Sequence, residues 1–229
     1  MDNALIIFIK NPIKGKVKTR IARTTGDEQA LSIYLELSKI IRHNVLLLQN
    51  VGFVGLQNHG LLRGISVYVF YSDFIEMNDE WSVPGFMKQL QTGDDLGERM
   101  YNAFDFVLKI HPRACIIGSD CPTLSAEIMQ QAFEQLISSD CVVGPSTDGG
   151  YYLLGIKNNE PTEPNSDGTP RSQSFLYLFE NMIWSTDQVL SNTLKRIEKN
   201  HLTVFLLPEL TDIDEEKDWL IFQKNRQGK

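Results

Sequence analysis

Apolar runs rich in β-branched residues alternate along this chain with longer segments that have the period of a helix. Several runs are apolar on both faces, as in strands that helices cover on both sides. The alternation favours βαβ units, and therefore an α/β fold with a mainly parallel central sheet flanked by helices. The expected strands are Ala4–Ile9, Ile65–Tyr71, Ala114–Gly118, Cys141–Gly144, Tyr151–Ile156 and Thr203–Leu207.

Three of the segments between these runs have helical periodicity. From Asp27 to Leu48, residues such as Leu31, Tyr34 and Ile41 recur at steps of three and four, which places them on one side of a long helix. The same pattern predicts helices over Leu96–Ile110 and Ser125–Ile137, and Ser125 is suited to cap the second of these.

Length and charge narrow the class of protein. The chain has 229 residues, which fill one α/β domain and are few for two, so we expect a single domain over residues 1–229. The formal net charge of -7 argues against a nucleic-acid-binding surface, which needs an excess of Lys and Arg. Any site for an anion must therefore be local.

The N-terminal run and the cysteines carry no targeting or disulfide signal. The run that ends at Ile9 is too short for a signal-peptide core or a membrane span, which predicts a cytoplasmic protein. Cys115, Cys121 and Cys141 lack C-x-x-C spacing, so we expect buried thiols rather than disulfides or zinc ligands. Whether the chain forms a homo-oligomer stays open.

A basic segment follows the first expected strand. The sequence KNPIKGKVKTR holds four lysines and one arginine in an otherwise acidic protein. Ligands of an open parallel sheet bind beyond the carboxyl ends of its strands, so these cations are placed for a phosphate chain. The alternative is a solvated basic loop, and neither a Walker A nor a GxGxxG motif is present. The expected nucleotide-binding residues here are Lys10, Gly15, Lys16, Lys18 and Arg20.

A carboxylate follows the strand expected at 114–118. Ser119 and Asp120 come at its end, and Pro122 prevents the strand from continuing. Mg²⁺ and Mn²⁺ commonly bind one or two protein carboxylates and complete their shell with phosphate oxygens and water. We therefore expect Asp120 to be a metal ligand with a catalytic role and Ser119 to contact the nucleotide. The alternative is that Asp120 caps the following helix.

The segment Asp148-Gly149-Gly150-Tyr151 joins two expected strands. Its glycines allow a tight turn and a close approach of the backbone to a ligand. We assign substrate binding to these four residues and a catalytic role, as a base, to Asp148. The alternative is an ordinary hairpin turn, because Asp-Gly is a common two-residue turn sequence.

Two acids, Asp212 and Asp214, follow the last expected strand. Either is a candidate second metal ligand, and we expect only one of them to face the site. The alternative is that they form the cap and acidic first turn of a C-terminal helix.

The segment Gln91–Met100 begins a helix with acids in its first turn. Capping accounts for Asp94 or Asp95, but not for Gly93, Gly97 and Arg99, since glycine at a helix start costs stability without a packing or ligand reason. We therefore add Gly93 and Arg99 to the expected nucleotide-binding residues. A second irregular stretch, residues 157–174, predicts a long loop, either a substrate lid or a simple insertion.

Together these segments resemble the bacterial DUF2064 group of glycosyltransferase-like proteins, whose members have the nucleotide-diphospho-sugar transferase (GT-A) fold. The resemblance is collinear and covers nearly the whole chain. It differs in that Ile21-Ala22-Arg23 stands where the group has Leu-Ala-Pro, and the 157–174 loop is longer. The matching segments are 8–12 with 15–20, 93–100, 117–122, 144–145 with 148–152, 184–186 and 207–214.

The resemblance implies that the basic loop holds nucleotide phosphates, that Asp120 stands at the position of the DxD-type metal aspartate, and that Asp212 or Asp214 completes a site for Mg²⁺ or Mn²⁺. A more distant similarity is to molybdenum-cofactor and phospholactate guanylyltransferases. The leading hypothesis is thus a metal-dependent glycosyltransferase that takes a nucleotide-diphospho-sugar and an unknown acceptor. The alternatives are a nucleotidyltransferase that releases pyrophosphate and a non-catalytic nucleotide-binding protein.

Overall fold

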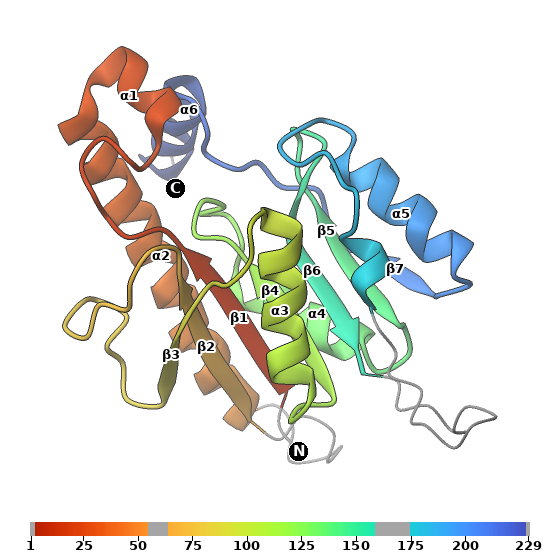
Figure 1. Ribbon diagram of the computed structural model, residues 1–229. Helices are drawn as coiled ribbons and strands as arrows, with labels where there is room; N and C mark the ends of the chain where they lie inside the picture. Colours follow the sequence, from red (N-terminus) through yellow and green to blue (C-terminus); the bar gives the residue numbers. More distant parts are fainter. Residues whose placement is uncertain (1–2, 55–63, 159–174, 228–229) are drawn as a thin grey trace.

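The computed structural model describes residues 3–54, 64–158 and 175–227 (Figure 1). Within them, seven strands form one mixed sheet in the order β3-β2-β1-β4-β6-β5-β7. The strands are β1 (Asn3–Ile9), β2 (Ile65–Tyr71), β3 (Phe86–Leu90), β4 (Arg113–Ile117), β5 (Cys141–Pro145), β6 (Tyr151–Lys157) and β7 (Val204–Leu206).

The mainly parallel α/β arrangement expected from the sequence is confirmed. All six expected strands are present, with ends that differ by at most one residue, and β3 is added at the edge. One strand, β6, runs antiparallel to both of its neighbours, β4 and β5. Since the β5–β6 connection spans only residues 146–150, it is too short for a crossover and must form a hairpin.

The three expected helices are also present. They are α2 (Asp27–Val54), α3 (Leu96–Leu108) and α4 (Ala126–Gln135), and the side chains of Asp95 and Ser125 cap the last two. Four further helical segments complete the described chain, namely α1 (Thr19–Thr25), the 3₁₀ helix η1 (Phe175–Leu178), α5 (Val189–Lys199) and α6 (Glu216–Gln227). Most of the predicted 157–174 loop, residues 159–174, lies outside the described residues.

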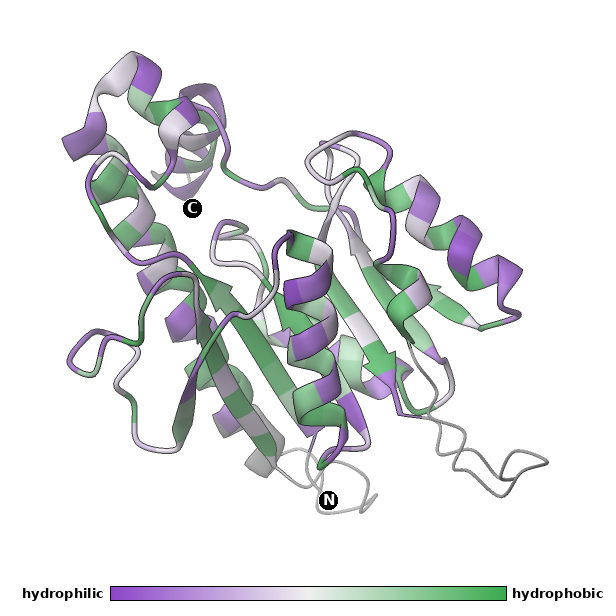
Figure 2. Cartoon of the chain, viewed as in Figure 1, coloured by the Kyte–Doolittle hydropathy of each residue, from purple (hydrophilic) through white to green (hydrophobic). Residues whose placement is uncertain are grey.

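Helices cover both faces of the sheet. In β1, Leu5 and Ile7 pack with α2 and α4, whereas Ala4 and Ile6 point to the other face, where α3, η1 and α5 lie. Figure 2 shows the result, with hydrophobic residues concentrated along the strands and on the helix sides that face them. All three cysteines are buried free thiols, as expected.

A smaller apolar cluster joins α1, α2 and α6 at one end of the molecule (Figure 1). Ile21, Ile33 and Leu37 pack there against Ile213 and Trp219 from the C-terminal part of the chain. This cluster holds α1 and the segment before α6 beside the carboxyl end of β1. Across the described segments, no helix combines the length and apolar character needed to cross a bilayer.

Candidate active site

A cleft of about 820 Å³ opens at the carboxyl ends of β1, β2 and β4. This is the edge at which open α/β sheets bind ligands, and the volume is in the range of small-molecule sites. The expected site residues that line it are Lys10, Lys18, Arg20, Arg99, Ser119, Asp120, Asp148, Gly150, Tyr151, Asp212 and Asp214.

Lys18 is the most enclosed cation of the cleft. Its side chain is 7% exposed, and its Nζ lies 2.9 Å from Oδ2 of Asp120 and 3.5 Å from Oδ1 of Asp214. Its backbone has φ 45° and ψ 46°, the left-handed region, at the residue that precedes α1. Burial lowers the pKa of Lys18, but the charges of Asp120 and Asp214 outweigh burial and raise the pKa above its ordinary value. Lys18 is therefore held charged between two loops.

Asp120 lies at the end of the β4 strand on the floor of the cleft. Burial favours its neutral form, but the Lys18 ammonium prevails and holds the pKa of Asp120 below its usual range. The Asp120 side chain is still 42% exposed, so an incoming ligand can reach it. Gly118 leaves the room this carboxylate needs, because a Cβ there would lie 2.7 Å from Asp120 Oδ1.

Asp212 approaches Asp120 from the C-terminal segment, whose Ile213 N–H donates to the backbone oxygen of Asp120 at 2.9 Å. Ser146 Oγ donates to Asp212 Oδ2 at 3.0 Å, whereas Oδ1 is buried and has no hydrogen-bond partner among the described residues. Burial raises the pKa of Asp212 to about 7, and the charge of Asp120 adds to that rise. A buried acceptor without a donor is costly, so this oxygen is suited to a ligand.

Asp214 lies on the same side of the chain as Asp212. The expectation that only one of them would face the site is wrong, since both line the cleft. Residues two apart in an extended segment share one side, and Ile213 between them is buried on the other. Asp214 pairs with Arg20 at 3.1 Å and with Lys18, so its oxygens already have cationic partners.

The carboxylates of Asp120 and Asp212 fit a divalent cation in part. They offer the hard oxygens that Mg²⁺ and Mn²⁺ prefer, and Asp212 Oδ1 lacks a donor. Among the residues that the structure describes, however, no group of three His, Cys, Asp or Glu side chains has the arrangement to hold a metal ion. The donor set thus suits a cation that arrives with oxygens of its own, from phosphate and water.

The β5–β6 turn forms the opposite side of the cleft. It is a hairpin, as the alternative interpretation of Asp148-Gly149 held, and Asp148 Oδ1 accepts from the N–H of Gly150 at 2.9 Å. Gly149 has φ 87°, and a Cβ there would lie 2.3 Å from the backbone oxygen of Asp187. Gly149 is thus needed to seat the turn against Asp187 and does not itself line the cleft, whereas Asp148, Gly150 and Tyr151 do.

Gly93 and Gly97, which helix capping did not account for in the sequence, lie at the start of α3. At Gly93, φ is 134°, a value that favours glycine, and its oxygen accepts from Nε of Arg99 at 3.0 Å. Gly97 packs directly under Trp184, since a Cβ at residue 97 would lie 2.8 Å from the indole ring. The Nε1 of Trp184 is buried and has no hydrogen-bond partner. Gly93 supports Arg99 from outside the cleft, and Gly97 lets Trp184 form part of its wall.

Part of the basic loop points away from the cleft. Gly15 has φ 78° in a turn, and both Gly15 and Lys16 are exposed and do not line the cleft. Lys14 forms an exposed pair with Glu28 at 2.6 Å. Of the expected phosphate-binding residues in this loop, the structure therefore brings together Lys10, Lys18 and Arg20.

Tyr34 and Asp187 line the cleft but were not among the expected site residues. The hydroxyl of Tyr34 accepts from the N–H of Lys10 at 2.9 Å and donates to the Lys10 oxygen at 2.7 Å. Burial raises its pKa to about 12. In the sequence Tyr34 occupies the apolar side of a helix, which predicts only a core residue. Asp187 directly follows the segment 184–186 of the family resemblance, and that position is the signal that could have found it. Ser146, the donor to Asp212, did have a signal, because it directly follows a strand.

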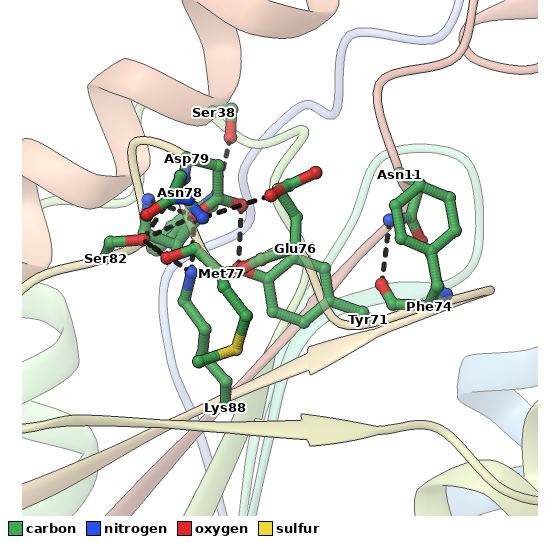
Figure 3. A network of polar contacts seen from close by, with 11 residues as sticks. Asn11, Ser38, Tyr71, Phe74, Glu76, Met77, Asn78, Asp79, Ser82 and Lys88 are labelled. Atoms are coloured by element: carbon green, nitrogen blue, oxygen red, sulfur yellow. Dashed lines mark hydrogen bonds and ion pairs between the residues drawn. The ribbon is translucent and has the colours of Figure 1, made fainter.

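The β2–β3 loop is fixed to the first strand by a separate polar network (Figure 3). The buried side chain of Asn11 donates to the oxygen of Phe74 at 2.8 Å and accepts from two backbone N–H groups of the same loop. Lys88 binds Asp79 at 2.6 Å, and Asp79 also accepts from the hydroxyl of Tyr71 at 2.7 Å. These contacts hold the loop that begins with Ser72, a residue of the cleft.

Comparison with known sequences identifies a family. The family described as an uncharacterized protein conserved in bacteria (DUF2064) matches residues 56–186, which is more than half of the chain. None of the curated proteins matches the sequence.

Several solved structures share the fold. A protein from Desulfovibrio desulfuricans G20, described provisionally as a nucleotide-diphospho-sugar transferase, is 26% identical with a TM-score of 0.73 over 94% of this chain and 84% of that chain. The inositol-1-phosphate CTP transferase from T. maritima has a TM-score of 0.54 at 12% identity, over 95% and 91%. The 4-diphosphocytidyl-2C-methyl-D-erythritolsynthase from Anaerococcus prevotii DSM 20548 has a TM-score of 0.52 at 9% identity, over 99% and 96%.

Proposed function

Since the chain belongs to the DUF2064 family and has a nucleotide-diphospho-sugar transferase-like fold, we propose that it transfers a glycosyl group from a nucleotide-diphospho-sugar to a hydroxyl acceptor. The proposal includes a divalent cation, Mg²⁺ or Mn²⁺. It rests above all on the unequal charge of the two sides of the cleft.

The β1 side of the cleft carries three cations, two of which, Lys18 and Arg20, pair with Asp120 and Asp214. Lys10, Lys18 and Arg20 line it, and all three come from the loop after β1 or the start of α1. The β5 side carries Asp148 and Asp187 together with the rings of Tyr151 and Trp184. Cations suit a diphosphate, whereas carboxylates and aromatic faces suit a neutral polyol. A nucleotide sugar has both parts in one molecule.

The leaving group would be stabilised from the β1 side. As the bond between the sugar and the diphosphate breaks, negative charge builds on the phosphate oxygens, and preorganised cations stabilise that charge most effectively in an enclosed site. Lys18 is already enclosed, and Arg20 can hold two oxygens at once. A bound Mg²⁺ or Mn²⁺, held by Asp120 and Asp212, would supply further positive charge at the same phosphates.

Asp148 would act as the base that takes the proton of the acceptor hydroxyl. One of its oxygens is oriented by the N–H of Gly150, and the side chain reaches the cleft from the side opposite the cations. In the proposed step the acceptor hydroxyl gives its proton to Asp148, its oxygen bonds to the anomeric carbon, and the bond from that carbon to the phosphate oxygen breaks. The nucleoside diphosphate leaves with the electron pair of that bond.

Nucleotidyl transfer is the second candidate, and one observation favours it. Arg99 is a fourth cation that lines the cleft, so the positive charge would also suit a triphosphate. In that reaction the acceptor attacks the α-phosphate and pyrophosphate leaves. The acids of the β5 side make a phosphate acceptor less favourable there than a neutral hydroxyl, which is why glycosyl transfer is preferred.

Product analysis separates the candidates. The protein is incubated with nucleotide sugars and, separately, with nucleoside triphosphates, each with Mg²⁺, Mn²⁺ or EDTA. Release of a nucleoside diphosphate from one sugar nucleotide, dependent on metal, is the expected result. Release of pyrophosphate from a triphosphate would replace the proposal by nucleotidyl transfer. Binding of a nucleotide without turnover in any mixture would favour a non-catalytic role.

A further inference from the structure

The ammonium of Lys18 stands where a cation would have to bind. It lies 2.9 Å from Asp120 Oδ2 and 3.5 Å from Asp214 Oδ1, and its side chain is only 7% exposed. Asp212 is the third carboxylate close enough to act on the charge of Lys18. A divalent cation bound to Asp120 would meet this ammonium at short range, where two like charges repel each other.

The side chain of Lys18 is also free to move its ammonium away from Asp120. Within the part of the chain that the structure describes, its ammonium has one hydrogen-bonding partner, Asp120, whereas Asp214 is held independently by Arg20 at 3.1 Å. Its backbone is fixed in the left-handed conformation where α1 begins, so movement is confined to the flexible stem of the side chain. An ammonium leaving Asp120 without a new partner would be left uncompensated in an enclosed site, which is unfavourable. A phosphate group in the cleft provides that partner.

We propose that Lys18 is an internal counter-ion that excludes free divalent cations from Asp120 until a phosphate ligand draws it away. Metal and phosphate then bind together, and neither binds well alone. This inference rests on the proposed function for its ligand, a metal-bound nucleotide, but it concerns the free protein and can be tested there.

The test measures binding of Mn²⁺ alone, by titration calorimetry, to the unaltered protein and to three variants. Lys18→Met removes the ammonium. Lys14→Met is the matched control, because Lys14 also pairs with a carboxylate, Glu28 at 2.6 Å, but outside the cleft. The double variant Lys18→Met with Asp120→Asn shows whether any new binding occurs at Asp120.

We expect Mn²⁺ to bind Lys18→Met at least tenfold more tightly than the unaltered protein. Lys14→Met should match the unaltered protein, and the double variant should lose the gain. Equal Mn²⁺ affinity in the unaltered protein and a folded Lys18→Met would overturn the inference. An equal gain in Lys14→Met would also overturn it, because the effect would then reflect net charge alone.

A second variant guards against loss of the fold. Lys18→Gln keeps a donor to Asp120 but no charge, so if Lys18→Met fails to fold by circular dichroism, the same comparison with Lys18→Gln decides. The outcome is separable from the proposed function. Tighter Mn²⁺ binding by the variant supports the counter-ion role even if no nucleotide sugar is turned over, and turnover without that gain supports the proposed function alone.

Discussion

Among the residues described, Lys88 and Lys18 are both enclosed and both pair with an aspartate, but the two pairs differ in how completely their polar groups are satisfied. Lys88 and Asp79 are 10% and 16% exposed, and the Lys88 ammonium has three acceptors, namely Asp79, Ser82 and the oxygen of Glu76 (Figure 3). Lys18 is similarly enclosed, but Asp120 is 42% exposed and is the one hydrogen-bonding partner of the Lys18 ammonium in the described chain.

The difference distinguishes a pair whose polar groups all have partners from a pair that can still take a ligand. A network in which each group has its partners gains rigidity and has nothing to offer a ligand. A pair with an open carboxylate and an orphaned oxygen nearby, Asp212 Oδ1, has capacity left for a ligand. Two pairs of the same residue types should therefore respond differently to substitution.

Loss of the Lys88 ammonium should have the largest effect on stability. Lys88→Met leaves Asp79 enclosed and unpaired, which we expect to lower the free energy of unfolding by about 3 kcal/mol, measured by urea denaturation. Ligand affinity of the folded variant should not change. Lys109→Met is the control, because its pair with Asp105 is exposed and contributes little to stability. Similar losses in both variants would contradict the distinction.

At the cleft we expect a loss of ligand binding without a loss of stability. Asp120→Ala should abolish metal-dependent nucleotide binding, a loss of about 100-fold or more, while the melting temperature stays nearly constant, because Asp214 still faces Lys18. Thermal shifts with each nucleotide, with metal and with EDTA, measure the effect. Asp105→Ala is matched to it in exposure, 45% against 42%, and should bind like the unaltered protein. Unchanged binding by Asp120→Ala would remove Asp120 from the site.

A change at Gly97 should affect the β5 side without touching either charged pair. In Gly97→Ala the new Cβ would lie 2.8 Å from the Trp184 ring, so the ring must shift, at a cost of about 2 kcal/mol in stability. We expect affinity for a nucleotide sugar to fall more than affinity for the corresponding nucleoside diphosphate, in parallel calorimetric titrations. Equal losses for the two ligands would mean that Trp184 does not contact the sugar.

The smallest effect is expected at Tyr34, which supports the cationic side from below. Tyr34→Phe removes both hydrogen bonds to the Lys10 backbone, so phosphate-ligand affinity should fall about fivefold, which corresponds to ~1 kcal/mol of binding. Tyr68→Phe is the control, since the Tyr68 hydroxyl contacts His111 instead. Tyr68→Phe should lower the stability of the protein without lowering its affinity for a phosphate ligand. Equal affinity losses in both would show that the effect is general.

The fold was largely predictable, because strands such as Ile65–Tyr71 are continuous apolar runs. Among the elements that were not predicted, β3 and α1 escaped for physical reasons. In β3 the sequence Phe-Met-Lys-Gln-Leu includes two polar residues at an edge strand, and α1 is a single short element that depends on Ile21 packing against α2 and α6. Trp81 lies among polar and turn-forming residues, which predicts exposure, yet it is 2% exposed because its ring packs into the core and its N–H donates to Ser38.

The candidate site was predictable in outline only. Residues that directly follow a strand, such as Lys10 and Asp120, could be found because parallel strands bring their carboxyl ends together. The sequence could not show which residues of the basic loop enter the cleft. Nothing in the spacing of Lys16 and Lys18 indicates that Lys16 is exposed and Lys18 is enclosed. That depends on the left-handed turn at Lys18, a conformation with no local sequence signal.

The segment before α6 crosses the carboxyl end of the sheet, with Leu210 bonded to Pro145, Thr147 bonded to Leu210 and Ile213 bonded to Asp120. It delivers Asp212 and Asp214 to a cleft whose other walls are built from earlier parts of the chain. On the ribosome, where synthesis proceeds from the N-terminus, the sheet can therefore form before these two acids emerge. A nascent chain would acquire its cationic side first, and the acids that balance it would be the last parts of the site to arrive.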